Sequence, residues 1–500
     1  MKALLKATLL AALAGAGTAL PAQTAPQAPV ALSPCRIPGM ELEMQCGVLR
    51  RPLDPAQPQG RSIELHFAVL PALARVKKPD PIVFFAGGPG QSAIDLAASI
   101  SRAMTRLNNR RDIILVDQRG TGRSAALNCP TDSATRPLAE QVDPVRQEQL
   151  LTRCLADLQK LPQGALRHYT TAVAVQDLEA LRQALRVQQW NLVGASYGTR
   201  VALEVLRQNP ASVRRLVLDG VAPPDMALPA AFSTDNQAAL DAVLAACRDD
   251  EACQRRYPNL RWQWQALLRS LPRQAQVAHP VTGELERITL TRDMVLSLLR
   301  SALYVPSVAA ALPAAIAQAQ GGRFEPLVGL ASAIGSRRRA AGLSQGMHFA
   351  VICAEDLPRL PRSGDVAGAD FGTTFADLYR RVCGAVPQST VPEAFYSVAT
   401  SPAAALLLSG GADPATPPRH GARVAQGLGD KARHVVVAQA GHGVSALPCV
   451  RDLIYRFIDA EDEATALREP SDCAAQVPRP RPFLPPMSPA SPAPAASSPR

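Results

Sequence analysis

Two short runs of continuous apolar residues constrain the fold of this 500-residue chain more than any other feature. Ile82–Phe85 leads into the turn Gly87-Gly88-Pro89-Gly90, and Ile113–Val116 leads into the glycine-rich residues 117–124. A strand that is apolar at every position is buried on both faces, which is typical of a parallel sheet covered by helices. The sequence therefore predicts two buried strands that each stop at a tight turn.

The same pattern returns later in the chain. Helical spacing of apolar residues over 171–185 and 199–208 alternates with further strand-like runs, which are 190–193, 216–219, 404–408 and 435–437. Strands that alternate with helices predict parallel pairing with crossover connections. We therefore expect an α/β fold with a doubly wound, mostly parallel sheet.

Changes in composition divide the chain into five parts. We expect a signal peptide at 1–22, a first core part at 34–224, a helical cap inserted at 225–400, a second core part at 401–473 and a Pro-rich tail at 474–500. The cap segment is rich in Ala, Leu and Arg at helical spacing, with few strand signals. The tail is dense in Pro, Ala and Ser, which predicts a disordered or polyproline-like segment.

The first residues and the cysteines indicate export. Lys2 and Lys6 precede a short apolar run, as in a secretory signal peptide, and no later stretch is long and uncharged enough to span a membrane. The ten cysteines are even in number, so we expect five disulfides between neighbours in sequence. Zinc is the rival interpretation, but no C-x2-C motif is present, so no metal is predicted. We expect a secreted or periplasmic protein without stable membrane insertion.

The charge of the chain does not indicate a nucleic-acid partner. The net charge is +11, yet the arginines are spread along the chain, and the only tight basic cluster is at 337–339. Aromatic residues make up only 4%, which is few for stacking on bases. We interpret the positive charge as a solvated basic surface.

A serine nucleophile is predicted at Ser196. Residues 194–198 read Gly-Ala-Ser-Tyr-Gly and match the G-x-S-x-G elbow, in which small residues allow a sharp turn from strand to helix. Residues 342–346 match the same pattern around Ser344. Ser196 lies between a strand pattern and a helix pattern, whereas no strand precedes Ser344. We therefore assign the nucleophile to Ser196 and interpret Ser344 as part of a cap loop.

A serine hydroxyl needs a base and an orienting carboxylate, which this fold supplies in the order Ser, Asp, His. Asp413 and His442 each follow a predicted strand in a glycine-bearing loop, where open α/β sheets place their sites. The rival acid is Asp219, which is more simply a turn residue before Gly220. The rival histidines, which lie in a helix-like stretch and at a strand start, are His420 and His434.

The oxyanion of an acyl-transfer intermediate needs preorganised N–H donors. The N–H of Tyr197, directly after the nucleophile, is one candidate. The second is expected from the turn after the first buried strand, at Gly87 or Gly88. The proposed chemistry needs no cofactor.

Five motifs in order resemble the proline iminopeptidase and secreted tripeptidyl aminopeptidase family of α/β-hydrolases, over about residues 34–473. They are residues 86–90, 117–124, 194–198, 413–417 and 441–443. The resemblance implies a serine exopeptidase with a helical cap that acts on free peptide N-termini. Proline iminopeptidases usually carry His where Ala86 stands and Trp where Tyr197 stands, so the chain is more similar to the tripeptidyl aminopeptidase branch.

An aminopeptidase must bind the ammonium group of its substrate, which calls for carboxylates near the site. Glu355 and Asp356 in the cap segment are the candidates, and a solvated or helix-capping acidic pair is the alternative. We expect a peptide or small acyl substrate. An esterase or lipase acting on acyl esters, and an inactive binding protein, are the other hypotheses.

Overall fold

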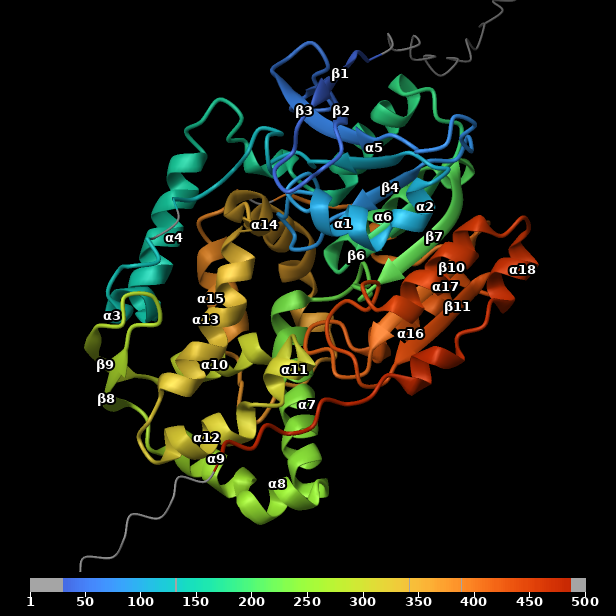
Figure 1. Ribbon diagram of the computed structural model, residues 1–500. Helices are drawn as coiled ribbons and strands as arrows, with labels where there is room; N and C mark the ends of the chain where they lie inside the picture. Colours follow the sequence, from blue (N-terminus) through green and yellow to red (C-terminus); the bar gives the residue numbers. More distant parts are fainter. Residues whose placement is uncertain (1–29, 131–132, 341, 388, 487–500) are drawn as a thin grey trace, which may run out of the picture.

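The computed structural model describes residues 30–130, 133–340, 342–387 and 389–486 (Figure 1). The predicted signal peptide and the end of the Pro-rich tail lie outside these residues, as do the side chains of the arginine cluster at 337–339. No helix in the described ranges combines the length and the apolar character needed to cross a membrane.

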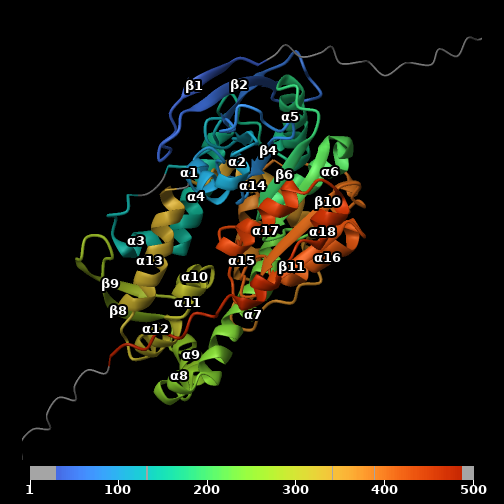
Figure 2. The same cartoon turned by 45° about the vertical axis from the view of Figure 1, so that its right-hand side comes forward.

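A nine-stranded sheet in the order β1-β2-β3-β5-β4-β6-β7-β10-β11 runs through the molecule (Figures 1 and 2). Its strands are β1 (Leu32–Cys35), β2 (Met44–Pro52), β3 (Ser62–Leu70), β4 (Ile82–Phe85), β5 (Ile113–Val116), β6 (Trp190–Ala195), β7 (Val213–Asp219), β10 (Ala404–Gly410) and β11 (Ala432–Val437). The pairs from β5 to β11 are parallel, and those from β1 to β5 are antiparallel. The predicted α/β fold with a mostly parallel sheet is confirmed. The three N-terminal strands were not predicted.

The apolar strands face a hydrophobic cluster on each side of the sheet. Ile82 and Phe84 of β4 pack in one cluster, whereas Val83 and Phe85 pack in the other. The helices beside the sheet are α1 (Ala97–Ala103), α2 (Thr105–Asn108), α5 (Thr171–Ala184), α6 (Tyr197–Gln208), α16 (Pro418–Leu428), α17 (Pro448–Asp459) and α18 (Glu463–Arg468). Because both faces are covered, strands without any polar position are stable here.

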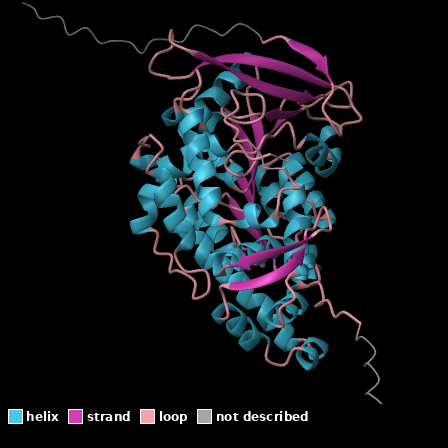
Figure 3. Cartoon of the chain, turned by 90° about the vertical axis from the view of Figure 1, so that its left-hand side faces the viewer, coloured by secondary structure: helices cyan, strands magenta, loops and turns pink. Residues whose placement is uncertain are grey.

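The segment between β7 and β10, where we predicted the cap, is mostly helical (Figure 3). Its helices are α7 (Leu228–Asp249), α8 (Glu251–Arg256), α9 (Leu260–Arg269), α10 (Arg292–Leu303), α11 (Pro306–Ala309), α12 (Leu312–Gln320), α13 (Glu325–Ala340), α14 (Gln345–Val351) and α15 (Thr374–Cys383). Two further helices, α3 (Leu138–Val142) and α4 (Pro144–Leu158), precede α5. The short helical turns are η1 (Leu166–His168), η2 (Pro210–Ser212), η3 (Ile352–Asp356), η4 (Leu357–Arg362), η5 (Glu393–Tyr396) and η6 (Asp472–Gln476).

The segment also contains a two-stranded hairpin of β8 (Arg273–Ala278) and β9 (Leu285–Leu290). Its burial alternates along each strand, with Val277 and Ile288 turned inward. Short strands with so few apolar positions give a weak sequence signal, which is why the hairpin was not predicted.

Five disulfides join the cysteines in sequence order, as predicted. The pairs are Cys35–Cys46, Cys129–Cys154, Cys247–Cys253, Cys353–Cys383 and Cys449–Cys473. None of the ten cysteines is free. Each bond closes a short loop, so it restricts the unfolded chain locally rather than joining distant parts of the molecule.

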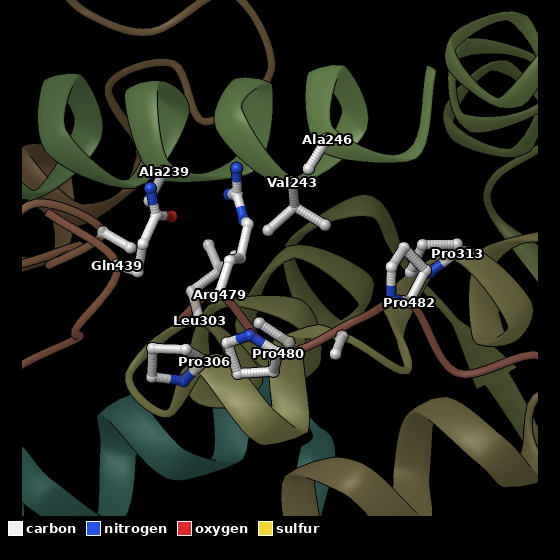
Figure 4. Close-up of a pocket in the computed structure, with 13 residues that line it drawn as sticks. Ala239, Val243, Ala246, Leu303, Pro306, Pro313, Gln439, Arg479, Pro480 and Pro482 are labelled. Carbon is white, nitrogen blue, oxygen red and sulfur yellow. The ribbon is translucent and has the colours of Figure 1, made fainter. Parts of the chain in front are cut away.

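The first part of the Pro-rich tail lies along the cap segment (Figure 4). Arg479 Nη2 donates to the carbonyl of Ala242 in α7 at 3.2 Å, and the N–H of Phe483 donates to the carbonyl of Ala310 at 2.8 Å. Together with Pro480 and Pro482, this stretch covers a cavity of about 40 Å³ beside α7, α11 and α12. The two hydrogen bonds hold a segment that is neither helix nor strand against the cap.

Candidate active site

Ser196 lies in a sharp turn between β6 and α6. Its φ of 55° and ψ of −124° are rare for a residue with a side chain. The turn closes only because its neighbours are small. A Cβ atom on Gly194 would lie 2.4 Å from the carbonyl oxygen of Gly198, and one on Gly198 would lie 2.0 Å from the carbonyl oxygen of Phe85. The half-buried serine is therefore held at the carboxyl end of the sheet, as in a nucleophile elbow.

Asp413 and His442 are hydrogen-bonded at the ends of the two last strands. His442 Nδ1 and Asp413 Oδ2 are 2.8 Å apart. The carboxylate also accepts the N–H groups of Ala415 and Thr416 at 2.7 and 2.9 Å, and the hydroxyl of Thr416 at 2.8 Å. The Asp413 side chain is fully buried, while that of His442 is 19% exposed. This arrangement fixes the tautomer of the imidazole, with the proton on Nδ1 and Nε2 left as the basic atom.

Asp413 remains ionised in spite of its burial. Burial acts to raise the pKa of this carboxyl, but the neighbouring His442 and the N–H donors of Thr416 and Ala415 outweigh it, so the pKa lies below its ordinary value. A charged carboxylate beside the ring stabilises the imidazolium that forms when a base accepts the proton of a serine.

The end of β7 adjoins both Ser196 and His442. The N–H of Ser196 donates to the carbonyl of Asp219 at 2.8 Å. A Cβ atom on the next residue, Gly220, would lie 3.3 Å from Cε1 of His442, the ring carbon between the two nitrogens. The structure therefore brings Ser196, Asp413 and His442 together at one edge of the sheet.

Asp219, the rival acid, contacts the loop that carries His442. Its carboxylate accepts the N–H of Val444 at 2.9 and 3.0 Å and the N–H of Ser445 at 2.8 Å. Burial raises its pKa, and these N–H donors lower it in part. The side chain therefore holds the backbone that follows His442, while Asp413 contacts the ring.

A residue of the cap segment also contacts His442. Tyr304, which follows α10, accepts the N–H of His442 at its carbonyl at 3.3 Å. The two rings meet edge to face, with centroids 5.4 Å apart and planes at 81°. The position of the His442 ring therefore depends on the cap segment as well as on the sheet.

The turn at residues 87–90, where we predicted an oxyanion donor, lies against Ser196. A Cβ atom on Gly87 would lie 3.0 Å from the Cβ of Ser196, whereas one on Gly88 would lie 3.1 Å from Leu343 Cδ1. Tyr197 begins α6, and its phenol, which is almost fully buried, is 2.6 Å from the hydroxyl of Thr171. Gly87 thus adjoins the serine directly, and Gly88 faces the cap.

Glu355 and Asp356 are fully buried behind α6. Glu355 accepts the N–H of Thr171 at 2.6 Å and its hydroxyl at 2.9 Å, and lies 3.5 Å from Arg200 Nη1. Asp356 accepts from Arg200 and from the N–H of Leu228. The cation paired with both carboxylates is therefore the Arg200 guanidinium, so the contact to a substrate ammonium that we predicted is not available in this arrangement.

Burial, together with the nearby Asp356, raises the pKa of Glu355 to about 7, although Arg200 and the donors of Thr171 act to lower it. One guanidinium balances one carboxylate, so a protonated Glu355 leaves this buried cluster without net charge. The cluster connects the start of α6, directly after Ser196, to η3 of the cap segment.

The other candidates from the sequence lie in different surroundings. Ser344 is buried, and its hydroxyl donates to Asn128 Oδ1. His420 Nε2 is 2.9 Å from Asp235 Oδ2, and His434 Nε2 is 2.9 Å from the hydroxyl of Ser409. The described residues contain no group of three or more His, Cys, Asp or Glu side chains that could hold a metal ion.

A cavity of about 1070 Å³ lies between α4, α10, α14 and α15. Apolar side chains line much of it, including Leu158, Met294, Phe349 and Phe375, and Gln345 is among its other lining residues. Gln345 directly follows Ser344, whose N–H donates to the carbonyl of Gly90 in the turn at residues 87–90. The cavity is large enough for several amino-acid residues.

Thr416, Tyr304 and the carboxylate of Asp219 also lie around His442 or its loop. Sequence reasoning assigned no role to Thr416 or Tyr304, and it considered Asp219 only as a rival acid or a turn residue. Thr416 follows Asp413 by three residues, and at this spacing a hydroxyl can donate a hydrogen bond to the carboxylate. The sequence therefore contained a weak indication of this contact. For Tyr304 it contained none, because only the folded chain brings α10 beside residue 442.

Two family models match the chain. The model described as alpha/beta hydrolase fold matches residues 80–244, and the model described as TAP-like protein matches residues 368–465. The first range contains Ser196 and the turn at residues 87–90, and the second contains Asp413 and His442. The two matched ranges are separate in sequence, but both contribute residues to the site.

Several relatives match parts of the chain. The serine protease Hip1 of Mycobacterium tuberculosis is 33% identical over 217 residues, which are 39% of this chain and 40% of Hip1. The tripeptidyl aminopeptidase of Streptomyces coelicolor is 30% identical over 194 residues, 36% of each chain. The proline iminopeptidase of Arabidopsis thaliana is 29% identical over 153 residues, 29% of this chain and 28% of the relative.

Each of these matches spans less than half of the relative's length. The nine-stranded sheet and the family-model matches agree with the resemblance that the motifs indicated. The chain has the α/β-hydrolase fold, and over part of its length it is similar to proline iminopeptidases and tripeptidyl aminopeptidases.

Proposed function

We propose that the protein is an exported serine exopeptidase that cleaves peptides through an acyl-enzyme on Ser196. The observation that carries the chemistry is the 2.8 Å hydrogen bond between His442 Nδ1 and a fully buried, ionised Asp413. Both groups lie at the sheet edge where Ser196 occupies its strained turn. A base with a fixed tautomer near a half-buried serine hydroxyl is an arrangement suited to acyl transfer.

In the proposed reaction, Ser196 Oγ attacks the carbonyl carbon of the scissile bond while His442 Nε2 accepts the hydroxyl proton. The N–H groups of Tyr197 and of Gly87 or Gly88 stabilise the resulting oxyanion. The C–N bond then breaks, and the amine leaves with the proton from His442. Water attacks the ester, His442 again accepts and returns a proton, and the free serine is restored.

The peptide substrate is proposed from the relatives and from a cavity that is lined in part by Gln345, the residue after Ser344. The TAP-like match contains two members of the triad, and the relatives include a serine protease and two peptidases named for their action at N-termini. The cavity of about 1070 Å³ offers more room than a short acyl ester needs. Glu355, Asp356 and Arg200 support the start of α6 in this proposal.

Export is proposed from two features. Lys2, Lys6 and the following apolar run have the pattern of a secretory signal peptide. Five disulfides use every cysteine of the chain, as expected for a protein that folds in an oxidising compartment. A secreted or periplasmic location follows from both.

Substrate panels test the proposed activity. The purified protein is assayed with tripeptidyl and aminoacyl p-nitroanilides, the same compounds N-acetylated, and short p-nitrophenyl esters, with a Ser196→Ala variant as the control. We expect cleavage of amides with a free amine, strong loss on acetylation, and no activity in the variant. Hydrolysis of the esters alone would support the carboxylesterase alternative, and equal cleavage of acetylated peptides would exclude an exopeptidase that needs a free N-terminus.

A further inference from the structure

The second G-x-S-x-G segment packs against the oxyanion turn. We call residues 343–348 the clamp segment and residues 87–90 the oxyanion turn. The N–H of Ser344 donates to the carbonyl of Gly90 at 2.9 Å, and Leu343 pairs with Gln91 in an isolated antiparallel bridge. The contact is tight, because a Cβ atom on Gly90 would lie 2.8 Å from the carbonyl oxygen of Ser344.

The clamp segment makes a further contact through the side chain of His348. Its Nδ1 is 3.1 Å from the carbonyl oxygen of Pro89, and its Nε2 is 2.8 Å from the hydroxyl of Tyr379 in α15. A carbonyl oxygen only accepts hydrogen bonds, so Nδ1 must carry the proton. In the neutral ring Nε2 is then an acceptor, and the Tyr379 hydroxyl donates to it.

The surroundings of His348 keep the ring neutral and in place. Its side chain is buried, and burial lowers its pKa to about 4, although the bond to Pro89 acts to raise it. Phe349 and Tyr379 pack around the ring, with centroids 5.2 and 5.9 Å from it. The Cys353–Cys383 disulfide joins the two helical regions that carry His348 and Tyr379. The Nδ1–H group of His348 is therefore a fixed donor that points from the cap segment toward the oxyanion turn.

We infer that His348 is a positioning residue for the oxyanion turn, with Tyr379 fixing the tautomer that lets it act. The turn needs such support because it contains three glycines, and Gly88 and Gly90 have φ angles of 111° and 106°. His348 fixes the carbonyl of Pro89 and Ser344 fixes that of Gly90, so two successive peptide groups beside the expected donors are held. An oxyanion site is effective only when its donors are oriented before the reaction.

This inference rests on the proposed function, so its test uses a reaction that does not depend on the natural substrate. A fluorophosphonate probe reacts with a serine nucleophile: the oxygen forms a bond to phosphorus, fluoride leaves, and the base accepts the proton. The phosphoryl oxygen occupies the oxyanion site. The maximal labelling rate reports on that site, and the concentration for half-maximal rate reports on binding of the probe.

Three variants separate the hydrogen bond from the packing. His348→Leu removes both ring nitrogens, His348→Asn retains an N–H donor at the position of Nδ1, and Tyr379→Phe removes only the donor to Nε2. We expect the maximal labelling rate to fall about tenfold or more in His348→Leu, less in Tyr379→Phe, and to recover to within about threefold of the original rate in His348→Asn. The half-maximal concentration should stay unchanged throughout.

Two results would overturn the inference. One is labelling of His348→Leu and Tyr379→Phe at the original rate. The other is equal slowing of His348→Leu and His348→Asn, which would assign the effect to packing. If His348→Leu does not fold, Tyr379→Phe and His348→Asn still give the comparison. Failure to label the unaltered protein would instead contradict the proposed serine hydrolase, and the inference with it.

Discussion

At the scale of single residues, the orientation of His442 depends on a carboxylate that accepts three hydrogen bonds besides that of the imidazole. Thr416 supplies two of the three donors, its N–H and its hydroxyl. Its hydroxyl also lies 3.2 Å from His442 Nδ1. Removing the hydroxyl therefore loosens Asp413 and the ring together, without changing the nucleophile.

Thr416→Val keeps the shape of the side chain and removes its hydroxyl. A hydrogen bond to a charged group contributes about 1.5–3 kcal/mol, so we expect kcat to fall about tenfold or more with KM nearly unchanged. Thr416→Ser retains the hydroxyl and serves as the matched control. Steady-state kinetics on the best substrate of the panel measure both parameters. Equal kcat in Thr416→Val and the parent protein would contradict this role.

The buried cluster behind α6 predicts a pH dependence of stability. The raised pKa of Glu355, about 7 against an ordinary value of 4.5, means that the folded state binds this proton more tightly than the unfolded state. Its contribution to folding is therefore complete below the ordinary pKa and is lost as the pH rises through the folded-state value.

Glu355→Gln is neutral at every pH and removes this dependence. We expect the free energy of unfolding of the parent protein, relative to that of the variant, to decrease between about pH 5 and about pH 8. Urea denaturation of both proteins at about pH 5 and at about pH 8 gives the difference in unfolding free energy at each pH. If this difference in unfolding free energy is the same at both pH values, or increases with pH, Glu355 does not hold a proton in the folded protein.

The positions of Ser196, Asp413 and His442 at strand ends could be predicted from the sequence, because each follows a strand whose apolar run is visible in the chain. The residues around them could not. Asp219 contacts Val444 across 225 positions, and His348 contacts Pro89 across 259. Such pairs have no local pattern, since they are neighbours only after the sheet and the cap have packed.

At the scale of elements, the parallel strands were predictable and the antiparallel ones were not. β4 and β5 are buried at all four positions, and the sequence shows them as uninterrupted apolar runs. β2 contains Gln45, Arg50 and Arg51, and three of the six residues of β8 are Arg or Gln. Strands exposed on one side share their residue types with loops, so periodicity alone does not distinguish them.

The elbow between β6 and α6 gives a prediction at this scale. In Gly198→Ala the new Cβ would lie 2.0 Å from a main-chain oxygen of β4, which cannot move without disturbing the sheet. We expect a loss of about 2 kcal/mol or more in unfolding free energy. The control is Gly329→Ala in α13, where nothing lies within 4 Å of the new atom. There alanine should be neutral or stabilise the helix by up to about 1 kcal/mol. Equal denaturation midpoints for the two variants would contradict the close packing of the elbow.

At the scale of the whole molecule, the cap segment is attached to the core on several sides. α16 of the core reaches α7 through Asp235, which accepts from Arg419 at 2.7 Å and lies 2.9 Å from His420. The clamp segment contacts the oxyanion turn, and Tyr304 contacts His442. The C-terminal stretch then crosses from the core to α7 and α11 (Figure 4).

Deleting residues 478–500 removes this last attachment. The loss of its two hydrogen bonds and of the proline packing should lower the melting temperature by about 2–4 °C. It should also expose the cap to limited proteolysis. A chain that ends at Pro486 retains the contacts of Arg479 and Phe483 and is the matched control. Identical melting curves and protease patterns for both truncations would show that the stretch does not fasten the cap.

We propose that Ser196, and not Ser344 of the second matching pentapeptide, forms the acyl-enzyme. Labelling with a fluorophosphonate probe followed by peptide mapping by mass spectrometry tests it most directly. We predict one adduct per chain, located on Ser196, still formed on that residue in Ser344→Ala and abolished in Ser196→Ala together with all peptide hydrolysis. An adduct on another serine, or hydrolysis that continues in Ser196→Ala, would contradict the account.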